Sequence, residues 1–204
     1  MAVKMMHKKK KIYYIADLHL YSQAVNQKSG RPFPNAVDMT ETILQNWRDT
    51  VSASDKVYVI GDVCKYNLPD GRLQQIFQEL PGEKHLILGN HDIVYRYKKA
   101  FFRCFSTVKK YDKIIDAGRH VVLFHYPMEA WDGMNYQDAY HIHGHVHGKD
   151  EELMYLPKRY NAAADHIGFT PCTLDEFIQR DKNRRRWCAS FSYAAENCHN
   201  PTSF

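Results

Sequence analysis

Short runs of apolar residues, each closed by a polar residue or a glycine, recur along the first three quarters of the chain. Isoleucine, valine, leucine, tyrosine and phenylalanine dominate these runs, and such composition is typical of buried strands. The predicted strands are Ile12 to Ala16, Val57 to Ile60, His85 to Leu88, Val121 to Phe124, and Tyr140 to Ile142.

Two stretches between the first three predicted strands have the spacing of amphipathic helices. Their apolar faces are Met39, Ile43, Leu44, Trp47 and Val51 in the first stretch and Leu73, Ile76, Phe77 and Leu80 in the second. Strands that alternate with amphipathic helices predict crossover connections and a largely parallel sheet. In such sheets, functional side chains gather outside the carboxyl ends of the strands.

Later in the chain, the pattern changes from crossover units to a hairpin. Lys113 to Ala117 and His120 to Phe124 flank the dipeptide Gly118-Arg119, which predicts a tight turn between antiparallel strands. A hairpin beside a parallel sheet indicates a mixed α/β sandwich rather than a pure doubly wound sheet. Near the C-terminus, Thr173 is predicted to cap a helix, with Glu176 as its capping-box partner.

The composition suits one compact domain, which we expect to span residues 1–204. The chain has 44% hydrophobic residues, and it contains no apolar run long enough to cross a membrane. The basic start, Met1 to Lys11, precedes only a short apolar stretch and makes a poor signal peptide. Five widely spaced cysteines predict neither a disulfide framework nor a zinc knuckle. A reducing cytoplasm is the expected compartment.

The net charge of +5 is concentrated in part near the C-terminus, where Arg180, Lys182 and Arg184 to Arg186 lie close together. Cations at the end of a helix complement the negative end of its dipole, so a solvated helix end is favoured over contact with a phosphate backbone. From about residue 184 we expect a basic and flexible tail.

Side chains that commonly bind metal ions follow closely behind every predicted strand. They are Asp17 and His19, Asp62, Asn90 and His91, His125, and finally His145 and His147. Taken singly, each has a simpler explanation: Asp17 as a helix cap or turn residue, Asn90 as a turn former, or His125 as a core histidine. Together and in order, they predict a two-metal hydrolytic site at one sheet edge. Asp92 is expected to cap a following helix instead.

The order of these residues resembles the calcineurin-like metallophosphoesterases, whose pattern is Asp-x-His, Gly-Asp, Gly-Asn-His-Asp/Glu, His and Gly-His-x-His. The chain especially resembles the small, single-domain bacterial and phage members, which carry a similar Arg-Pro-Phe (here Arg31 to Phe33) before the first helix. The resemblance implies an α/β sandwich of mixed central sheets flanked by helices, in four layers. It also implies one ion on Asp17, His19 and His147, a second ion on Asn90, His125 and His145, Asp62 as the bridge, and His91 as the catalytic acid.

The chemistry of such a site favours a phosphodiester. Two divalent ions bring four positive charges, and Asp17, Asp62 and a bridging hydroxide remove three, which leaves one charge to match a diester monoanion. The protein phosphatases of the family carry arginines beside these motifs, whereas this chain has Cys64, Lys65 and Leu88 there. It also lacks the aspartate that orients the catalytic histidine in those phosphatases, so the partner of His91 stays open.

Arg31 and Asn161 are the candidate substrate contacts. Asn161 or Asp165 has a second possible role, because a histidine that binds metal usually needs a partner for its other ring nitrogen.

We therefore expect a dinuclear metal-dependent phosphoesterase that acts on a small or nucleotide-like phosphodiester by attack of a metal-bridging hydroxide. Manganese is the first choice of metal, and iron, nickel and zinc suit the same ligands. Two alternatives stay open: a nuclease that acts on RNA or DNA ends with the same site, and a metal-bound interaction scaffold without catalysis. Oligomeric state is not predicted.

Overall fold

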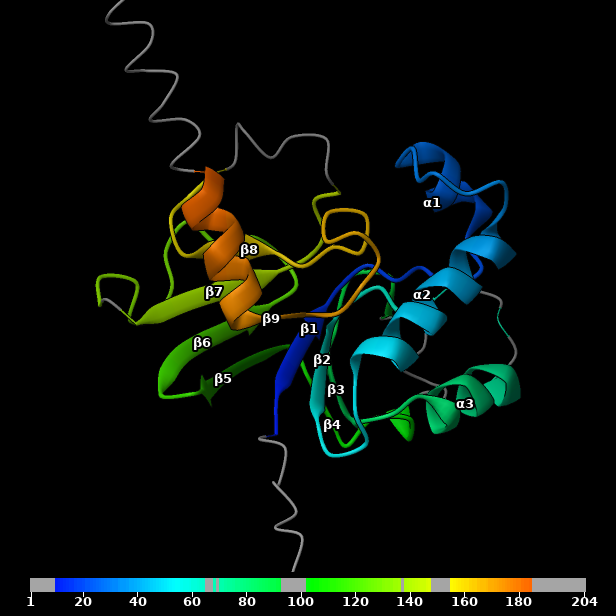
Figure 1. Cartoon of the computed structure of the whole chain (residues 1–204), viewed down its shortest axis with the longest axis horizontal. Coiled ribbons are helices and arrows are strands. Elements are labelled where there is room, and N and C mark those ends of the chain that lie inside the picture. Colours follow the sequence, from blue (N-terminus) through cyan, green and yellow to red (C-terminus); the bar gives the residue numbers. More distant parts are fainter. Residues whose placement is uncertain are drawn as a thin grey trace, which may run out of the picture.

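The structure is a computed structural model, and it describes residues 10–64, 68, 70–92, 102–136, 138–147 and 155–184. Two β-sheets lie between layers of helices (Figure 1). The predicted helix after Asp92, the side chain of Lys65 and the basic tail beyond residue 184 lie outside the described residues. None of the described helices is long and apolar enough to span a membrane.

The first sheet has five strands in the order β4-β3-β2-β1-β9. Its strands are β1 (Ile12–Ile15), β2 (Lys56–Ile60), β3 (Glu83–Ile87), β4 (Thr107–Lys109) and β9 (Cys172–Thr173). The first four run parallel, and only β9 pairs antiparallel, against β1. The predicted parallel sheet is therefore present, with one antiparallel strand at its edge.

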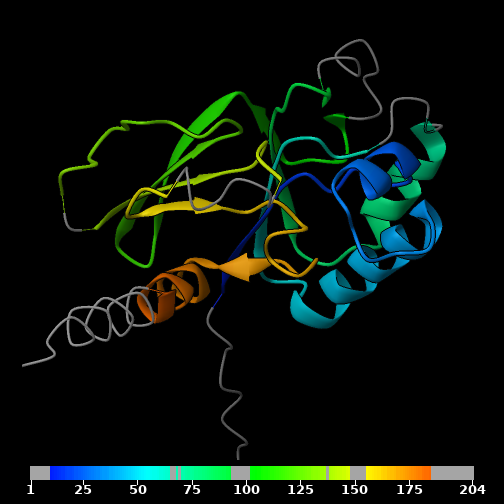
Figure 2. The ribbon, with the colours of Figure 1, turned by 90° about the horizontal axis from the view of Figure 1, so that it is seen from above.

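Helices α1 (Gln23–Lys28), α2 (Ala36–Thr50) and α3 (Asp70–Glu79) lie on the side of the first sheet that faces away from the second sheet (Figure 2). The side chain of Asn35 begins α2 by accepting hydrogen bonds from the backbone N–H groups of Val37 and Asp38. The predicted apolar faces of both longer helices are buried. This burial anchors the helices to the sheet and fixes the loops at its edge.

The second sheet has the order β5-β6-β7-β8. Its strands are β5 (Tyr111–Asp116), β6 (Arg119–Phe124), β7 (Ala139–His143) and β8 (Arg159–Asn161). The predicted hairpin is β5-β6, but its turn lies one residue earlier than predicted. Ala117 and Gly118 form the turn with φ of 49° and 85°, and Arg119 already pairs with Asp116. Positive φ at both central residues is the signature of a type I′ turn.

A helix over residues 174–184 lies against the second sheet. The predicted capping box is present, because the Thr173 N–H donates to the Glu176 carboxylate (2.6 Å) and the Glu176 N–H donates to the Thr173 hydroxyl (3.4 Å). Phe177 stacks on Tyr160 of β8, with ring centroids 5.6 Å apart. Helices therefore cover both outer faces, and the chain is a mixed α/β sandwich as predicted.

The two sheets are joined through the main chain of small residues. Ala16, just after β1, donates its N–H to the carbonyl of Ala162 (2.7 Å) and accepts from the N–H of Ala164 (2.9 Å). All three alanines are fully buried. Larger side chains would hold the backbones apart, so this alanine run allows β1 and the end of β8 to meet. The carboxyl ends of strands from both sheets consequently converge.

Candidate metal centre

Four of the predicted ligands have left-handed backbone conformations. The φ values are 53° at Asp17, 45° at His19, 57° at Asp62 and 69° at His145. This region is unfavourable for residues other than glycine, and such strain concentrates at functional sites. The three loops bend sharply at the strand ends, and the bends bring the side chains toward a common centre.

The first group of ligands is Asp17, His19 and His147. The Oδ1 atom of Asp17 lies 3.8 Å from Nε2 of His19 and 3.8 Å from Nε2 of His147. These separations are too long for hydrogen bonds but short enough for atoms that share one ion at about 2.0–2.2 Å each. Asp17 Oδ1 and His19 Nε2 are buried and have no hydrogen-bond partner. Two buried polar atoms without partners fit a cation between them.

The second group is Asn90, His125 and His145. Oδ1 of Asn90 lies 3.1 Å from Nε2 of His125 and 3.1 Å from Nδ1 of His145. The Nδ1 atom of His125 is 2.8 Å from the carbonyl of Ile60, which requires a proton on Nδ1. In the neutral ring, Nε2 then carries a lone pair that faces another acceptor, Asn90 Oδ1. A cation bound by both atoms would offset the repulsion between these two lone pairs.

Asp62 lies between the two groups. Its Oδ2 atom is 3.6 Å from Nε2 of His19 in the first group and 3.6 Å from Nε2 of His125 in the second. Its other oxygen, Oδ1, accepts a hydrogen bond from the backbone N–H of His91 (2.9 Å). Asp17, Asp62 and His125 also offer ligand atoms within 4.8 Å of one another. One carboxylate therefore adjoins both groups, which is the position that a bridging ligand needs.

Burial changes the protonation of the first group. Desolvation raises the pKa of Asp17 well above its usual value, and the neighbouring charge of Asp62 raises it further. Desolvation lowers the pKa of His19 to about 2, helped by the positive charge of Arg31. His19 is thus neutral, the form in which imidazole binds metals. A bound cation would favour the ionised form of Asp17 and offset its desolvation.

His91 is the exposed member of the cluster, with 61% of its side chain accessible. Its Nε2 atom lies 3.9 Å from Asp62 Oδ2, and its ring packs edge-on against His19 at 5.4 Å. The backbone N–H of His91 donates to Asp62 Oδ1, and the ring lies beside His19 and the Asp62 carboxylate at distances longer than a hydrogen bond. An exposed imidazole beside buried ligands is suited to meet a substrate.

Asp165 contacts the ring nitrogen of His147 that faces away from Asp17. The sequence analysis offered Asp165 and Asn161 as candidates for such a contact. The Oδ2 atom of Asp165 lies 2.7 Å from Nδ1 of His147, so the ring donates there and turns the lone pair of Nε2 toward Asp17. The hydrogen bond to His147 and the charge of Arg31 outweigh burial and lower the pKa of Asp165. A carboxylate behind a histidine ligand fixes its tautomer and direction.

Asp165→Asn is expected to weaken Mn²⁺ binding by about 10- to 100-fold, because the histidine loses its fixed orientation while the fold is retained. Calorimetric titration of the apoprotein with Mn²⁺ measures the effect. Asp175→Asn, an exposed change on the helix over residues 174–184, is the control. An unchanged affinity in the Asp165 variant would show that His147 needs no such support.

The burial of Arg31 does not fit the expected substrate contact. Its side chain is fully buried, and its guanidinium donates to the carbonyls of Asp17 (2.7 Å) and Leu18 (3.1 Å). Its Nε atom lies 3.5 Å from Asp165 Oδ2. The arginine thus holds the Asp17 loop and the Asp165 carboxylate together beneath the site.

The side chain of Asn161, like that of Arg31, makes hydrogen bonds to backbone groups of the protein. Its Nδ2 donates to the carbonyl of Val146 (2.6 Å), and its Oδ1 accepts from the N–H of Ala163 (2.9 Å). Val146 lies between the predicted ligands His145 and His147. The geometry therefore favours a role for Asn161 in positioning the ligand loop rather than in touching a substrate.

Asp92 has a structural role that sequence analysis missed. Its buried carboxylate accepts hydrogen bonds from the backbone N–H groups of Asp62 (2.8 Å), Val63 (3.0 Å) and Gly89 (2.8 Å). These contacts tie the loop of Asp62 to the loop of Asn90. Its position directly after the Asn-His pair was the available signal, but the contacts themselves depend on the tertiary fold.

Gly144 allows the ligand loop to pass close to Asp17. A Cβ atom at this position would overlap the Asp17 carboxylate and would lie 2.6 Å from the Ala16 methyl group. Gly144→Ala is therefore expected to destabilise the protein by about 1–3 kcal/mol in urea unfolding.

The matched control is Gly71→Ala in α3, where the added methyl group would meet nothing within 4 Å. This change is expected to stabilise the protein by about 0.5–1 kcal/mol, because alanine loses less entropy in a helix. Equal stability of the two variants would contradict the close packing at Gly144.

Comparisons with known proteins give one family match and several similar proteins. A sequence profile of the calcineurin-like phosphoesterases matches residues 10–149. The chain is 30% identical over 174 residues to the uncharacterized protein MJ1445 of Methanocaldococcus jannaschii, covering 83% of this chain and 90% of that protein. It is 26% identical over 188 residues to the gene 66 protein of Mycobacterium phage L5, covering 76% and 84%. Among solved structures, the protein of unknown function AQ665 from Aquifex aeolicus superposes with a TM-score of 0.67 at 24% identity, covering 83% and 98%.

Proposed function

Because the chain belongs to the calcineurin-like phosphoesterase family and is a metal-dependent phosphoester hydrolase, we propose that it cleaves small phosphodiesters with two divalent cations. The observation that carries this proposal is the place of Asp62 Oδ2, 3.6 Å from one histidine of each ligand group. A carboxylate in that place would join two ions. The presence of all seven ligand residues and His91 argues against a scaffold without catalysis.

The proposed assignment follows the two groups. Asp17, His19 and His147 would hold one ion, Asn90, His125 and His145 would hold the other, and Asp62 would bridge them. When bound, the ions would supply a nucleophile from water at neutral pH and offset the charge of the phosphate. Oxygen and imidazole ligands suit manganese, which we propose as the first metal to test, and also iron, nickel and zinc.

His91 is the proposed general acid. Its exposed ring beside Asp62 would protonate the alkoxide that leaves phosphorus, a task suited to an imidazole. The hydrogen bond from the backbone N–H of His91 to the Asp62 carboxylate keeps this residue at the edge of the site. The other residues position ligands: Asp165 turns His147, and Arg31 and Asp92 hold the loops.

The contacts of Arg31 with the protein support a phosphodiester rather than a phosphomonoester as the substrate. A phosphomonoester dianion calls for an additional cation beside the metals, and the guanidinium of Arg31 is committed to backbone carbonyls and Asp165. A diester monoanion needs no such group.

We expect Mn²⁺-loaded protein to hydrolyse bis(p-nitrophenyl) phosphate with a kcat/KM at least about tenfold above that for p-nitrophenyl phosphate, a difference of about 1.4 kcal/mol. Release of p-nitrophenolate measures both reactions, and parallel assays with nickel and zinc test whether the preference depends on the metal. Turnover of the monoester alone would contradict the diester preference.

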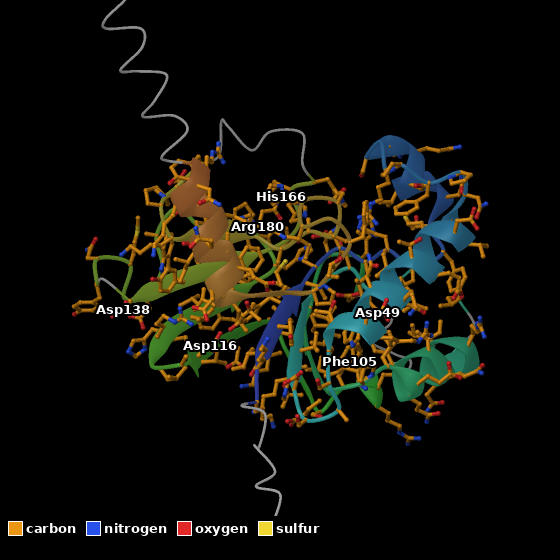
Figure 3. The ribbon with its side chains drawn as sticks, in the orientation of Figure 1. Asp49, Phe105, Asp116, Asp138, His166 and Arg180 are labelled. Atoms are coloured by element: carbon orange, nitrogen blue, oxygen red, sulfur yellow. The ribbon has the colours of Figure 1, made fainter. Side chains whose placement is uncertain are left out.

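A nuclease remains the second candidate, and one observation favours it. Arg159, Arg180 and Arg184 line a small hollow that also includes Asn161, which contacts the ligand loop. Figure 3 shows His166 and Arg180 beside one another at this place. A nucleic acid that follows these arginines would bind more weakly as salt rises, with a steep logarithmic slope, whereas a small diester would show little dependence.

The proposed compartment is a reducing cytoplasm. Cys64, Cys104 and Cys172, the cysteines among the described residues, are thiols rather than disulfides. Burial raises the pKa of the Cys172 thiol to about 11, which makes it unreactive. These thiols support a structural role for the cysteines in a reducing environment.

A further inference from the structure

Tyr126 lies directly beside the second ligand group. Its ring centroid is 4.6 Å from that of His145 and 5.1 Å from that of His125. The residue is 37% exposed. Its ring therefore touches two of the proposed metal ligands and also faces solvent.

Contacts other than those of its hydroxyl group fix the position of Tyr126. Phe124, the last residue of β6, packs against the tyrosine ring with centroids 5.5 Å apart. Two residues further on, the backbone N–H of Met128 donates to Nε2 of the buried His141 (3.2 Å) and anchors the loop. Within the described part of the chain, the phenol oxygen of Tyr126 has no hydrogen-bond partner. The partly exposed ring is thus held in place by packing, and not by a hydrogen bond from its hydroxyl group.

A braced aromatic ring beside a phosphate-binding centre offers a surface for stacking. Aromatic rings pair well with other planar rings, and stacking on a base contributes about 1–3 kcal/mol, which corresponds to roughly five-fold or more in affinity. The neighbouring candidate ligands set where a phosphorus atom would lie. A group attached to that phosphorus would therefore come within reach of the Tyr126 ring.

We propose that Tyr126 is a specificity-determining residue that stacks on a planar aromatic or heteroaromatic group attached to the phosphorus of the substrate. The proposal rests on the proposed function, and it narrows the substrate class to aryl or nucleoside phosphoesters.

The test is calorimetric binding of three product analogues to Mn²⁺-loaded protein: phenyl phosphate, adenosine 5′-monophosphate and methyl phosphate. They share the phosphate and differ in the attached group. Tyr126→Ala is expected to weaken binding of the ring-bearing phosphates by about five-fold or more, and to leave methyl phosphate within about two-fold. Tyr126→Phe is expected to restore the wild-type affinities, because the ring and not the hydroxyl carries the effect.

Tyr136→Ala is the matched control. Tyr136 is 73% exposed and lies just before β7, at the opposite end of that strand from the ligands. Its loss is expected to change none of the three affinities. Bound Mn²⁺, measured by atomic absorption, should be equal in all variants.

The outcomes separate this proposal from the function beneath it. Weaker binding of adenosine monophosphate alone supports a nucleobase as the stacked group, and weaker binding of phenyl phosphate alone supports a simple aryl ester. An equal loss for all three phosphates, or no loss for either ring, overturns the role of Tyr126 and leaves the hydrolase intact. Failure of the wild-type protein to bind any of the three while it holds Mn²⁺ would overturn the role of Tyr126, and failure to hold Mn²⁺ would contradict the metal site itself.

Discussion

Asp62→Asn is expected to lower kcat/KM for bis(p-nitrophenyl) phosphate by at least about 10³-fold, equivalent to about 4 kcal/mol of transition-state stabilisation. The carboxylate oxygen Oδ2 adjoins both ligand groups, and Oδ1 holds the backbone of His91. The amide removes a negative charge and presents only one acceptor. It would therefore bind at most one of the two ions well. Metal analysis of the purified variant should show fewer than two Mn²⁺ per chain.

Asp49→Asn provides the control for this loss. Asp49 lies on the exposed face of the last turn of α2, before the start of β2, where it accepts a hydrogen bond from the Gln45 side chain. This variant should keep both activity and metal content. An Asp62 variant with two bound Mn²⁺ and activity within about tenfold of the wild type would disprove the bridging role.

His91→Ala is expected to slow hydrolysis of a dinucleoside monophosphate, whose leaving group is an alkoxide, by about 10²- to 10⁴-fold. The loss for bis(p-nitrophenyl) phosphate should be much smaller, because p-nitrophenolate leaves without a proton. The exposed imidazole beside Asp62 is placed to supply that proton. Comparison of the two substrates therefore isolates proton transfer from metal binding.

The control for His91 is His120→Ala, which removes an imidazole from the start of β6, at the end of the strand opposite the ligands. Metal content should be unchanged in both variants. An equal loss for the two substrates in His91→Ala would assign the histidine to charge stabilisation or binding instead of acid catalysis.

The fold was predictable where local pattern and tertiary packing agree. The predicted strands and helical faces correspond to β1, β2, β3, β6, β7, α2 and α3, because long apolar patterns are sufficient to bury one face of an element. The short strands β4 and β9 have three and two residues, too few to show any periodicity. The turn of the hairpin was predicted one residue too late, because Ala117 adopts a positive φ that an alanine in the sequence does not indicate.

The candidate ligands were predictable because each follows a strand that ends at the same edge. The structure brings all seven of these side chains together. The supporting residues were not predictable in the same way. Arg31, Asn161 and Asp92 act on backbone groups far away in the sequence, and no spacing rule encodes which carbonyl or N–H group a buried polar side chain will reach.

The most direct measurement is anomalous X-ray diffraction from crystals soaked in Mn²⁺. Two anomalous peaks are expected, one among Asp17, His19 and His147 and the other among Asn90, His125 and His145, with Asp62 in contact with both. Peaks absent from this place, together with His145 and His147 turned away from Asp62, would contradict a dinuclear hydrolytic centre.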